Sequence, residues 1–245
     1  MPTHKRPEML ALALEKISNS ENQVDDVRIF ADTDCNIEEV EFVRDEYCPR
    51  ALIFHARPHV SVPSGMWNIL QALKAGYETK AEYVFLIEED VLVGRNFFNW
   101  HFTAQAANDY FATCGRRMRH LPSYNQYTNP GSCFKRGSLS LVVEHINDSL
   151  FENRQAYMDR TFGPMPEVSD LDDGLIRRIA KFYGLSVLYP DTPQCAHIGF
   201  RAYNHYMDWV NTGNIEQRIS KLRTMLSEID PNNRFTGDFE PILLS

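Results

Sequence analysis

The sequence lacks long apolar segments, paired cysteines and an excess of positive charge. No apolar run is long enough to cross a bilayer, and the polar N-terminal segment has no signal-peptide core. The five cysteines lie far apart without a CxxC pair, so we expect reduced thiols. The formal net charge of -8 at pH 7 provides no global field that attracts phosphate backbones or an anionic membrane. These features favour a cytoplasmic protein.

Several motifs that mark common enzyme classes are also missing. The sequence contains no GxxxxGK[ST] phosphate loop, no GxGxxG turn after a strand, no GxSxG elbow and no HExxH helix. The enzyme classes that depend on these motifs therefore lose support.

What is present is the pattern of one folded α/β domain. The 245 residues are 43% hydrophobic and 24% charged, which is typical of a globular chain. Apolar periodicity predicts helices near residues 7–17, 66–76, 96–111, 175–180 and 215–229, and strands near 27–31, 51–55, 83–87 and 185–189. Residues 116–137 are rich in turn formers and are expected to be mostly loop.

An acidic triplet follows the clearest predicted strand. Residues 83–87 run directly into Glu88, Glu89 and Asp90, and open α/β sheets bind ligands at the carboxyl ends of their strands. Three adjacent carboxylates repel one another, which suggests that a cation or a proton is shared among them. Mg²⁺ and Mn²⁺ prefer oxygen ligands and bind diphosphate at the same time. The alternative is an acidic turn that caps a helix.

Three further segments carry side chains that are candidates for catalysis, metal binding or phosphate binding. Asp172 and Asp173 are positioned to supply a general base, or simply to cap the helix that follows. His197 is a candidate ligand for a divalent ion, although a lone histidine is more often structural. The basic stretch from Arg116 to Arg136 is suited to phosphates or bases, or is a solvated loop.

In their order along the chain, five motifs resemble those of glycosyltransferases with the GT-A fold. The closest resemblance is to the inverting family typified by N-acetylglucosaminyltransferase I, in which a hydrophobic strand leads to Glu-Asp-Asp and a later Asp-Asp pair opens a helix. Here the first of these motifs reads Glu-Glu-Asp. The motifs are Thr3-His4-Lys5-Arg6-Pro7, Phe30-Ala31-Asp32, Phe85-Leu86-Ile87-Glu88-Glu89-Asp90-Val91, Asp172-Asp173-Gly174-Leu175-Ile176-Arg177-Arg178 and His197-Ile198-Gly199.

The resemblance implies a fold and an activity. The fold is a single GT-A (Rossmann-like) domain over residues 1–245, with a mixed, mainly parallel sheet flanked by helices. A nucleotide-sugar half would cover about residues 1–95, and an acceptor half with the C-terminal helix about residues 96–245. The activity is a metal-dependent, inverting transfer of a sugar from a nucleotide-diphosphate donor, UDP-sugar by preference, to an acceptor hydroxyl. The acceptor is a glycan or a hydroxymethylated base of viral DNA.

The resemblance also assigns roles by position. Asp90 and His197 would hold Mn²⁺ or Mg²⁺, and Asp172 would be the catalytic base, with Asp173 as its alternate. The nucleotide-binding set comprises Thr3, Arg6, Asp32, Glu88 and Glu89. Within it Glu89 would lie near the ribose, Glu88 would support the nucleotide pocket, and Asp32 and Arg6 would approach the base.

Two departures from the family pattern bear on these expectations. The Thr-x-x-Arg-Pro motif normally closes a first β-strand, yet only Met1 and Pro2 precede Thr3, so we expect that strand to be truncated, supplied differently or absent. The missing membrane anchor favours the cytosol of a bacterium or of a virus-infected host cell. Two other functions remain open: a nucleotidyltransferase, and a sugar-nucleotide-binding protein without turnover.

Overall fold

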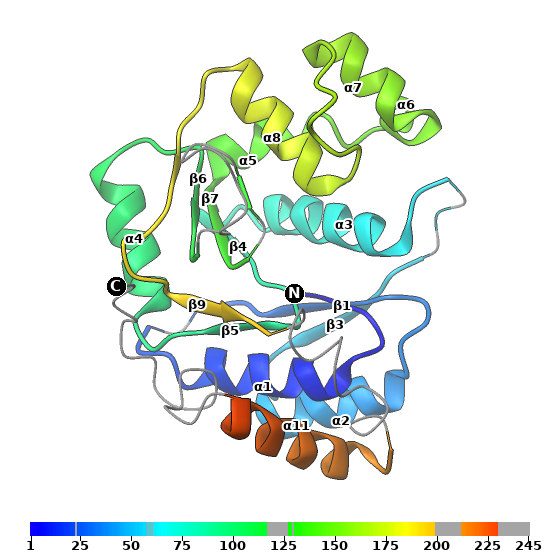
Figure 1. Cartoon of the computed structure of the whole chain (residues 1–245), viewed down its shortest axis with the longest axis vertical. Coiled ribbons are helices and arrows are strands. Elements are labelled where there is room, and N and C mark those ends of the chain that lie inside the picture. Colours follow the sequence, from blue (N-terminus) through cyan, green and yellow to red (C-terminus); the bar gives the residue numbers. More distant parts are fainter. Residues whose placement is uncertain are drawn as a thin grey trace.

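The computed structural model describes residues 1–22, 24–57, 59, 61–116, 127–128, 130–198 and 212–229. These residues form a mixed α/β fold in which helices cover both sides of the strands (Figure 1). None of the described helices is both long and apolar enough to cross a membrane. The five cysteines are free thiols, as the sequence predicts.

The first part of the chain alternates strands and helices. Its three strands are parallel and lie in the order β1-β2-β3, with Thr3 of β1 opposite Ala31 of β2. Strand β1 is present and consists of 2 residues, Pro2–Thr3. The elements are β1 (Pro2–Thr3), α1 (Pro7–Ser18), β2 (Arg28–Ala31), α2 (Ile37–Tyr47) and β3 (Leu52–His55).

The remaining strands form two groups with mixed directions. Strand order β4-β7-β6-β8 combines antiparallel β4–β7 and β6–β7 pairs with a parallel β6–β8 pair, and β5 pairs antiparallel with β9. The strands are β4 (Tyr83–Leu86), β5 (Val91–Val93), β6 (Ala112–Cys114), β7 (Ser132–Lys135), β8 (Val187–Leu188) and β9 (Cys195–His197). The helices are α3 (Ser64–Glu78), α4 (Phe97–Ala107), α5 (Arg136–Val143), α6 (Asp148–Glu152), α7 (Arg154–Phe162), α8 (Asp172–Phe182) and α11 (Ile215–Ile229).

Apolar residues gather in two clusters on opposite sides of the strands. One cluster joins α1, α2 and α11, and the other joins α3, α5, α7 and α8 (Figure 1). Helix α11 places Leu222 and Met225 in the first cluster, and Arg223 pairs with Glu15 of α1 at 3.0 Å. The last described helix is therefore packed against the first one.

Three local expectations are wrong in detail. The helix expected to end near Gly76 continues to Glu78. Gly76 instead allows α3 to lie close to β4, because a Cβ there would be 2.5 Å from a Val84 methyl group. The helix expected over residues 96–111 ends at Ala107 and is followed by strand β6. Strand β7 and the start of α5 lie at the end of the expected loop over 116–137.

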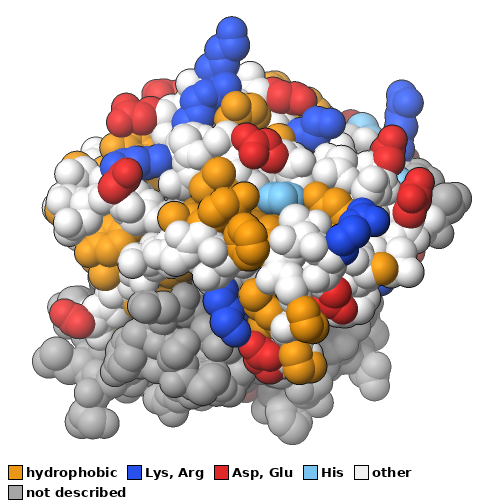
Figure 2. Space-filling view, turned by 90° about the horizontal axis from the view of Figure 1, so that it is seen from above, with side chains coloured by type: hydrophobic (Ala, Val, Ile, Leu, Met, Phe, Trp, Pro, Cys, Tyr) orange, Lys and Arg blue, Asp and Glu red, His pale blue; other side chains and the backbone are white. Residues whose placement is uncertain are grey.

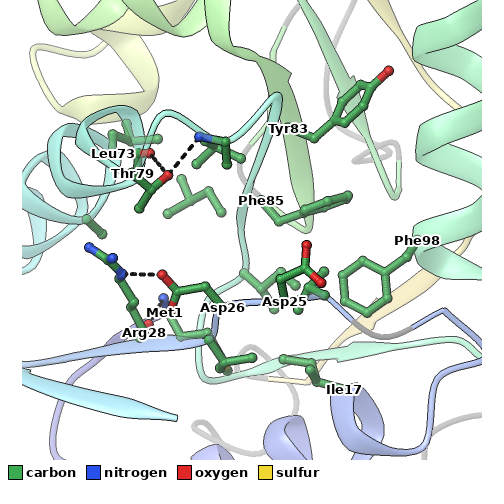
Figure 3. Close-up of a pocket in the computed structure, with 18 of the residues that line it drawn as sticks. Met1, Ile17, Asp25, Asp26, Arg28, Leu73, Thr79, Tyr83, Phe85 and Phe98 are labelled. Carbon is green, nitrogen blue, oxygen red and sulfur yellow. Dashed lines mark hydrogen bonds and ion pairs between the residues drawn. The ribbon is translucent and has the colours of Figure 1, made fainter. Parts of the chain in front are cut away.

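A cavity of about 390 Å³ separates the β1–β2 edge from β4. Its walls include Ile17, Arg28, Leu73, Phe85 and Phe98, which surround the opening in Figure 3. Phe85 and Phe98 pack edge to face, with ring centroids 5.0 Å apart. No residue that the sequence assigns to a site lines this cavity, so it is separate from the predicted site.

Candidate functional site

The acidic triplet lies in the tight turn between β4 and β5. The Val91 amide donates to the carbonyl of Glu88 at 3.1 Å, which closes the turn, and the strand residues on either side are buried. The turn therefore holds Glu88, Glu89 and Asp90 at the carboxyl end of β4, where the sequence predicts a ligand site.

Glu89 anchors the segment that follows β1. One of its oxygens accepts from the Thr3 hydroxyl and from the His4 amide at 2.6 Å, and the other accepts from Arg6 Nε at 2.6 Å. Lys5 turns this segment sharply with a φ of 56°, in the left-handed region. Burial raises the pKa of Glu89 to about 7, against the opposing effects of Arg6, Thr3 and His4. Glu89 thus connects two segments that are distant in sequence.

Arg6 shares its charge between two members of the triplet. Besides bonding Glu89, its Nη1 donates to Asp90 Oδ2 at 3.1 Å, and the Arg6 side chain is 20% exposed. One guanidinium therefore partly neutralises two buried carboxylates and fixes the orientation of Asp90. The positive charge of Arg6 therefore partly offsets the repulsion within the triplet, and it also opposes the rise in the pKa of Glu88.

His197 lies beside the remaining oxygen of Asp90. In the β5–β9 pair Val91 is opposite His197, and the Ile198 amide donates to the Asp90 carbonyl at 2.8 Å. His197 Nε2 is 3.5 Å from Asp90 Oδ1, and that oxygen is buried without a hydrogen-bond partner in the described part of the chain. The strand register thus brings together the two residues that the sequence analysis assigned to a metal.

The Asp90 and His197 pair fits a divalent cation as far as its donor set goes. An unbonded carboxylate oxygen next to an imidazole nitrogen suits Mn²⁺, which accepts both ligand types. Among the described residues no cluster of three or more His, Cys, Asp or Glu side chains could hold a metal alone. A cation here would need further ligands from a bound molecule or water, as is common for Mg²⁺ with substrate phosphates.

Asp172 lies close enough to Glu88 for its charge to act on that member of the triplet. Burial and, to a smaller extent, the neighbouring charges of Asp90 and Asp172 together raise the pKa of Glu88 to about 8. Asp172 is in the first turn of α8 and is only 6% exposed. The structure therefore brings Asp172, from a distant part of the sequence, next to the acidic triplet.

Asp173 has different surroundings from its neighbour. It accepts from Ser169 Oγ at 2.9 Å and pairs with Arg177 at 2.8 Å, one turn along the helix. The close turn depends on Gly174, because a Cβ there would lie 2.0 Å from the Ser169 carbonyl oxygen. Asp173 is thus engaged in stabilising the start of α8.

A second cavity, of about 290 Å³, opens beside the triplet. Asp32 lies behind it at the end of β2 and pairs with His4, with 2.8 Å between Asp32 Oδ2 and His4 Nδ1. Of the predicted nucleotide-binding residues, Thr3, Arg6, Glu88 and Glu89 line this cavity directly. Its full lining is Pro2, Thr3, His4, Arg6, Ser64, Gly65, Asn68, Ile69, Glu88 and Glu89.

Sequence reasoning did not single out His4, Ser64 or Asn68 as site residues. His4 directly follows β1 and Asp32 directly follows β2, and these two strands are parallel neighbours. The carboxyl ends of neighbouring parallel strands meet at one edge of a sheet. That relationship was the available signal for His4, whereas Ser64 and Asn68 come from α3 and carry no comparable sequence signal.

Only part of the predicted basic stretch lies in the described part of the chain. Residues 117–126 lie outside the described part of the chain. Lys135 pairs with Asp109 at 3.2 Å, and the Arg136 guanidinium lies over the Tyr77 ring, 4.2 Å from its centroid. These two cationic side chains therefore interact with residues outside the candidate site.

Comparison with known proteins identifies the fold. No family model matches the chain, and no curated protein matches it. A galactosyltransferase, LgtC, solved with donor and acceptor sugar analogues, matches with a TM-score of 0.50 at 11% identity, covering 77% of this chain and 71% of that one. TarS of S. aureus, residues 1–349, gives 0.49 at 13% identity, with 96% and 72% covered. A cytidylyltransferase from Leptospira borgpetersenii gives 0.46 at 10% identity, with 91% and 84% covered. The likeness to the galactosyltransferase shows that the described chain has the GT-A fold, which confirms the fold class predicted from the sequence.

Proposed function

We propose that the chain is a metal-dependent glycosyltransferase that uses a nucleotide-diphosphate sugar, UDP-sugar by preference, and an acceptor hydroxyl. The observation that carries the proposal is Asp90 Oδ1, a buried carboxylate oxygen without a hydrogen bond, 3.5 Å from His197 Nε2. The GT-A fold and the adjoining cavity of about 290 Å³ support it. A buried acceptor with no donor is unfavourable unless a ligand completes it.

Each residue of the metal pair is held in position by the chain. Asp90 Oδ2 is occupied by Arg6, so Oδ1 is the oxygen available to a cation. His197 is fixed by its place on β9 opposite Val91. When bound by Asp90 and His197, Mn²⁺ or Mg²⁺ would supply positive charge that neutralises the diphosphate leaving group.

Asp172 is the base that the geometry favours over Asp173. Asp172 is buried and its charge acts on Glu88 of the triplet, and Asp173 stabilises the start of α8 through Ser169 and Arg177. In the proposed reaction Asp172 accepts the proton of the acceptor hydroxyl as that oxygen attacks the sugar. Inversion at the anomeric carbon follows from the family resemblance.

The proposal allows two acceptors, a glycan and a hydroxymethylated base of viral DNA. Figure 2 shows the face above α6–α8, where Lys and Arg side chains alternate with Asp and Glu side chains. Such a surface gives little of the phosphate attraction on which duplex binding depends. The described part of this face therefore gives no support to the DNA form of the proposal, and the formal net charge of -8 also counts against tight duplex binding.

A donor screen in the presence of Mn²⁺ tests the proposal. Thermal stabilisation by one nucleotide-diphosphate sugar, with slow release of the nucleoside diphosphate, is the expected result. Full activity in EDTA would overturn the metal dependence. Release of pyrophosphate would indicate a nucleotidyltransferase, and binding without turnover on any acceptor would indicate a sugar-nucleotide-binding protein. Labelled donors with glycans in one arm and hydroxymethylated DNA in the other distinguish the acceptors.

A further inference from the structure

We propose that His4 binds the nucleoside part of the donor through Nε2, as a hydrogen-bond acceptor, and that Asp32 acts through His4 as a positioning residue. The proposal rests on the glycosyltransferase function above, which supplies a nucleotide ligand for the cavity beside the triplet. The ligand group that it requires is an N–H or O–H donor on the nucleoside.

Asp32 is already bonded inside the protein. It is 2% exposed, and its Oδ1 accepts from the Thr33 amide at 2.7 Å and from the Thr33 hydroxyl at 3.3 Å. Its Oδ2 lies 2.8 Å from His4 Nδ1. Both oxygens thus have partners within the chain, and Asp32 does not line the cavity. Its influence on a ligand would pass through the imidazole of His4, whose side chain is 45% exposed.

The bond to Asp32 determines what His4 can offer. A carboxylate oxygen only accepts hydrogen bonds, so the proton of the neutral imidazole is assigned to Nδ1. The other ring nitrogen, Nε2, then carries a lone pair and acts as an acceptor. A carboxylate that fixes the tautomer of a histidine in this way is a general device for orienting an imidazole.

Other groups around the same cavity are also acceptors. Asn68 Nδ2 donates to the carbonyls of Phe30 at 2.6 Å and Thr3 at 3.3 Å, which fixes the orientation of the amide. Asn68 Oδ1 is left buried without a hydrogen-bond partner in the described part of the chain. With Glu88 on the same wall, the cavity offers acceptors to a ligand that brings hydrogens, beside the donors Arg6 and Ser64.

These acceptors distinguish the nucleoside from the phosphates. A diphosphate has acceptor oxygens and negative charge, so in the proposed function its place would be beside a cation at Asp90. A nucleoside instead offers ribose hydroxyls and, in uracil, an imide N–H. A ribose hydroxyl and the uracil N–H would each donate a hydrogen bond to His4. Ligand analogues that lack one or the other distinguish the two.

Direct binding measurements with Mn²⁺ test the proposal. His4→Phe keeps the ring and removes the acceptor, so we expect UDP affinity to fall about tenfold, as for the loss of one neutral hydrogen bond. In turnover assays the effect should appear in the donor KM rather than in kcat. His4→Gln, which retains an acceptor, should recover much of the affinity. His55→Phe is the matched control, since His55 is exposed at the end of β3.

The analogues identify which hydrogen His4 receives. If the ribose supplies it, a 2′-deoxy or 3′-deoxy UDP should bind the unaltered protein about tenfold more weakly than UDP and should bind His4→Phe no worse than UDP does. If the base supplies it, N3-methyl-UDP and CDP should show that pattern instead. Equal weakening of all ligands by His4→Phe, or equal binding of all analogues by the unaltered protein, would overturn the proposal. The second outcome needs no variant and therefore holds even if His4→Phe fails to fold. A protein that binds no nucleoside diphosphate at all would instead overturn the glycosyltransferase function itself.

Discussion

His197 Nε2 lies 3.5 Å from Asp90 Oδ1 because strands β5 and β9 pair with Val91 opposite His197. If the two side chains share a cation, Asp90→Asn should reduce kcat at least about a hundredfold and abolish the stabilisation by Mn²⁺, because a bound metal contributes several kcal/mol to the transition state. His197→Ala should weaken Mn²⁺ binding in the same assay. Thermal melting with and without Mn²⁺, together with turnover, provides the measurements.

The matched control for Asp90→Asn is Asp109→Asn, because the Asp109 side chain is 95% exposed and pairs only at the surface with Lys135. This variant should change neither activity nor the response to Mn²⁺. Equal metal responses of the Asp90 and Asp109 variants would contradict the metal assignment.

Asp172 and Asp173 are neighbours with separable roles. Asp172→Asn should reduce kcat by about 10²–10⁴, the usual contribution of general base catalysis, with little change in donor affinity. Asp173→Asn should lower stability by less than about 1 kcal/mol, because it removes one partly exposed ion pair at a helix start, and should keep most of the activity. Steady-state kinetics and urea unfolding on both variants distinguish the two effects. The reverse assignment would be indicated if Asp173→Asn lost the larger share of kcat.

Arg6 should be important for stability as well as for the site. Replacing it by Ala leaves Glu89 and Asp90, both nearly buried, without their shared cation, and breaking a buried ion pair from one side costs about 3–5 kcal/mol. The Arg6 side chain is 20% exposed, so we expect a value of about 3 kcal/mol in urea unfolding. Arg6→Lys keeps the charge and loses the two-pronged geometry, and it should be intermediate.

A double-mutant cycle isolates the Arg6 and Glu89 interaction. The Arg6→Ala/Glu89→Gln double variant should lose less free energy of unfolding than the sum of the losses of the two single variants. The reason is that it removes the unpaired charge together with its partner. Strict additivity of the two changes would show that the bond between them contributes little.

The sequence predicts the elements that local patterns determine. Helix α1 is marked by Pro7 and by apolar residues at helical spacing, and strand β4 by a short run of branched and aromatic residues. It misses β7, because the residues before Ser132 are turn formers and the strand is stabilised by pairing with β4 and β6. It also misreads Gly76, whose missing side chain serves a close helix–strand contact and not the end of a helix. Such features depend on tertiary neighbours, which no local pattern contains.

In the candidate site, too, the sequence predicts what local motifs determine and misses what depends on tertiary contacts. Motif order brings out the acids and His197, yet sequence alone does not separate Asp172 from Asp173, because that distinction depends on how α8 is turned toward Glu88. The Arg6 bridge between Glu89 and Asp90 is likewise a tertiary relationship. His4 stands in a quoted motif, but its bond to Asp32 depends on the parallel pairing of β1 and β2.

Glu88 should make the metal-free protein less stable as pH rises. Burial and neighbouring acids raise its pKa from 4.5 to about 8, so between these values the folded state holds a proton that the unfolded state has lost. Stability is then highest below the unfolded pKa and declines as pH rises through the folded one, and Glu89, with a pKa of about 7, acts in the same direction. In EDTA the melting temperature should therefore fall between about pH 5 and pH 8, where each kcal/mol corresponds to roughly 2–4 °C for a domain of this size.

Glu88→Gln cannot ionise, so it should flatten the EDTA melting curve against pH, while Glu216→Gln, an exposed change on α11, should leave the slope intact. Mn²⁺ should oppose the decline in the unaltered protein, because a cation at Asp90 and His197 favours the ionised form of the neighbouring carboxylates, and its binding should release protons near pH 7.5. A melting temperature in EDTA that is constant from pH 5 to pH 8 would mean that Glu88 ionises normally. In that case ionising the acidic triplet would cost no more free energy than ionising carboxylates in an exposed turn. The repulsion among its charges would then no longer be a reason to propose a cation there.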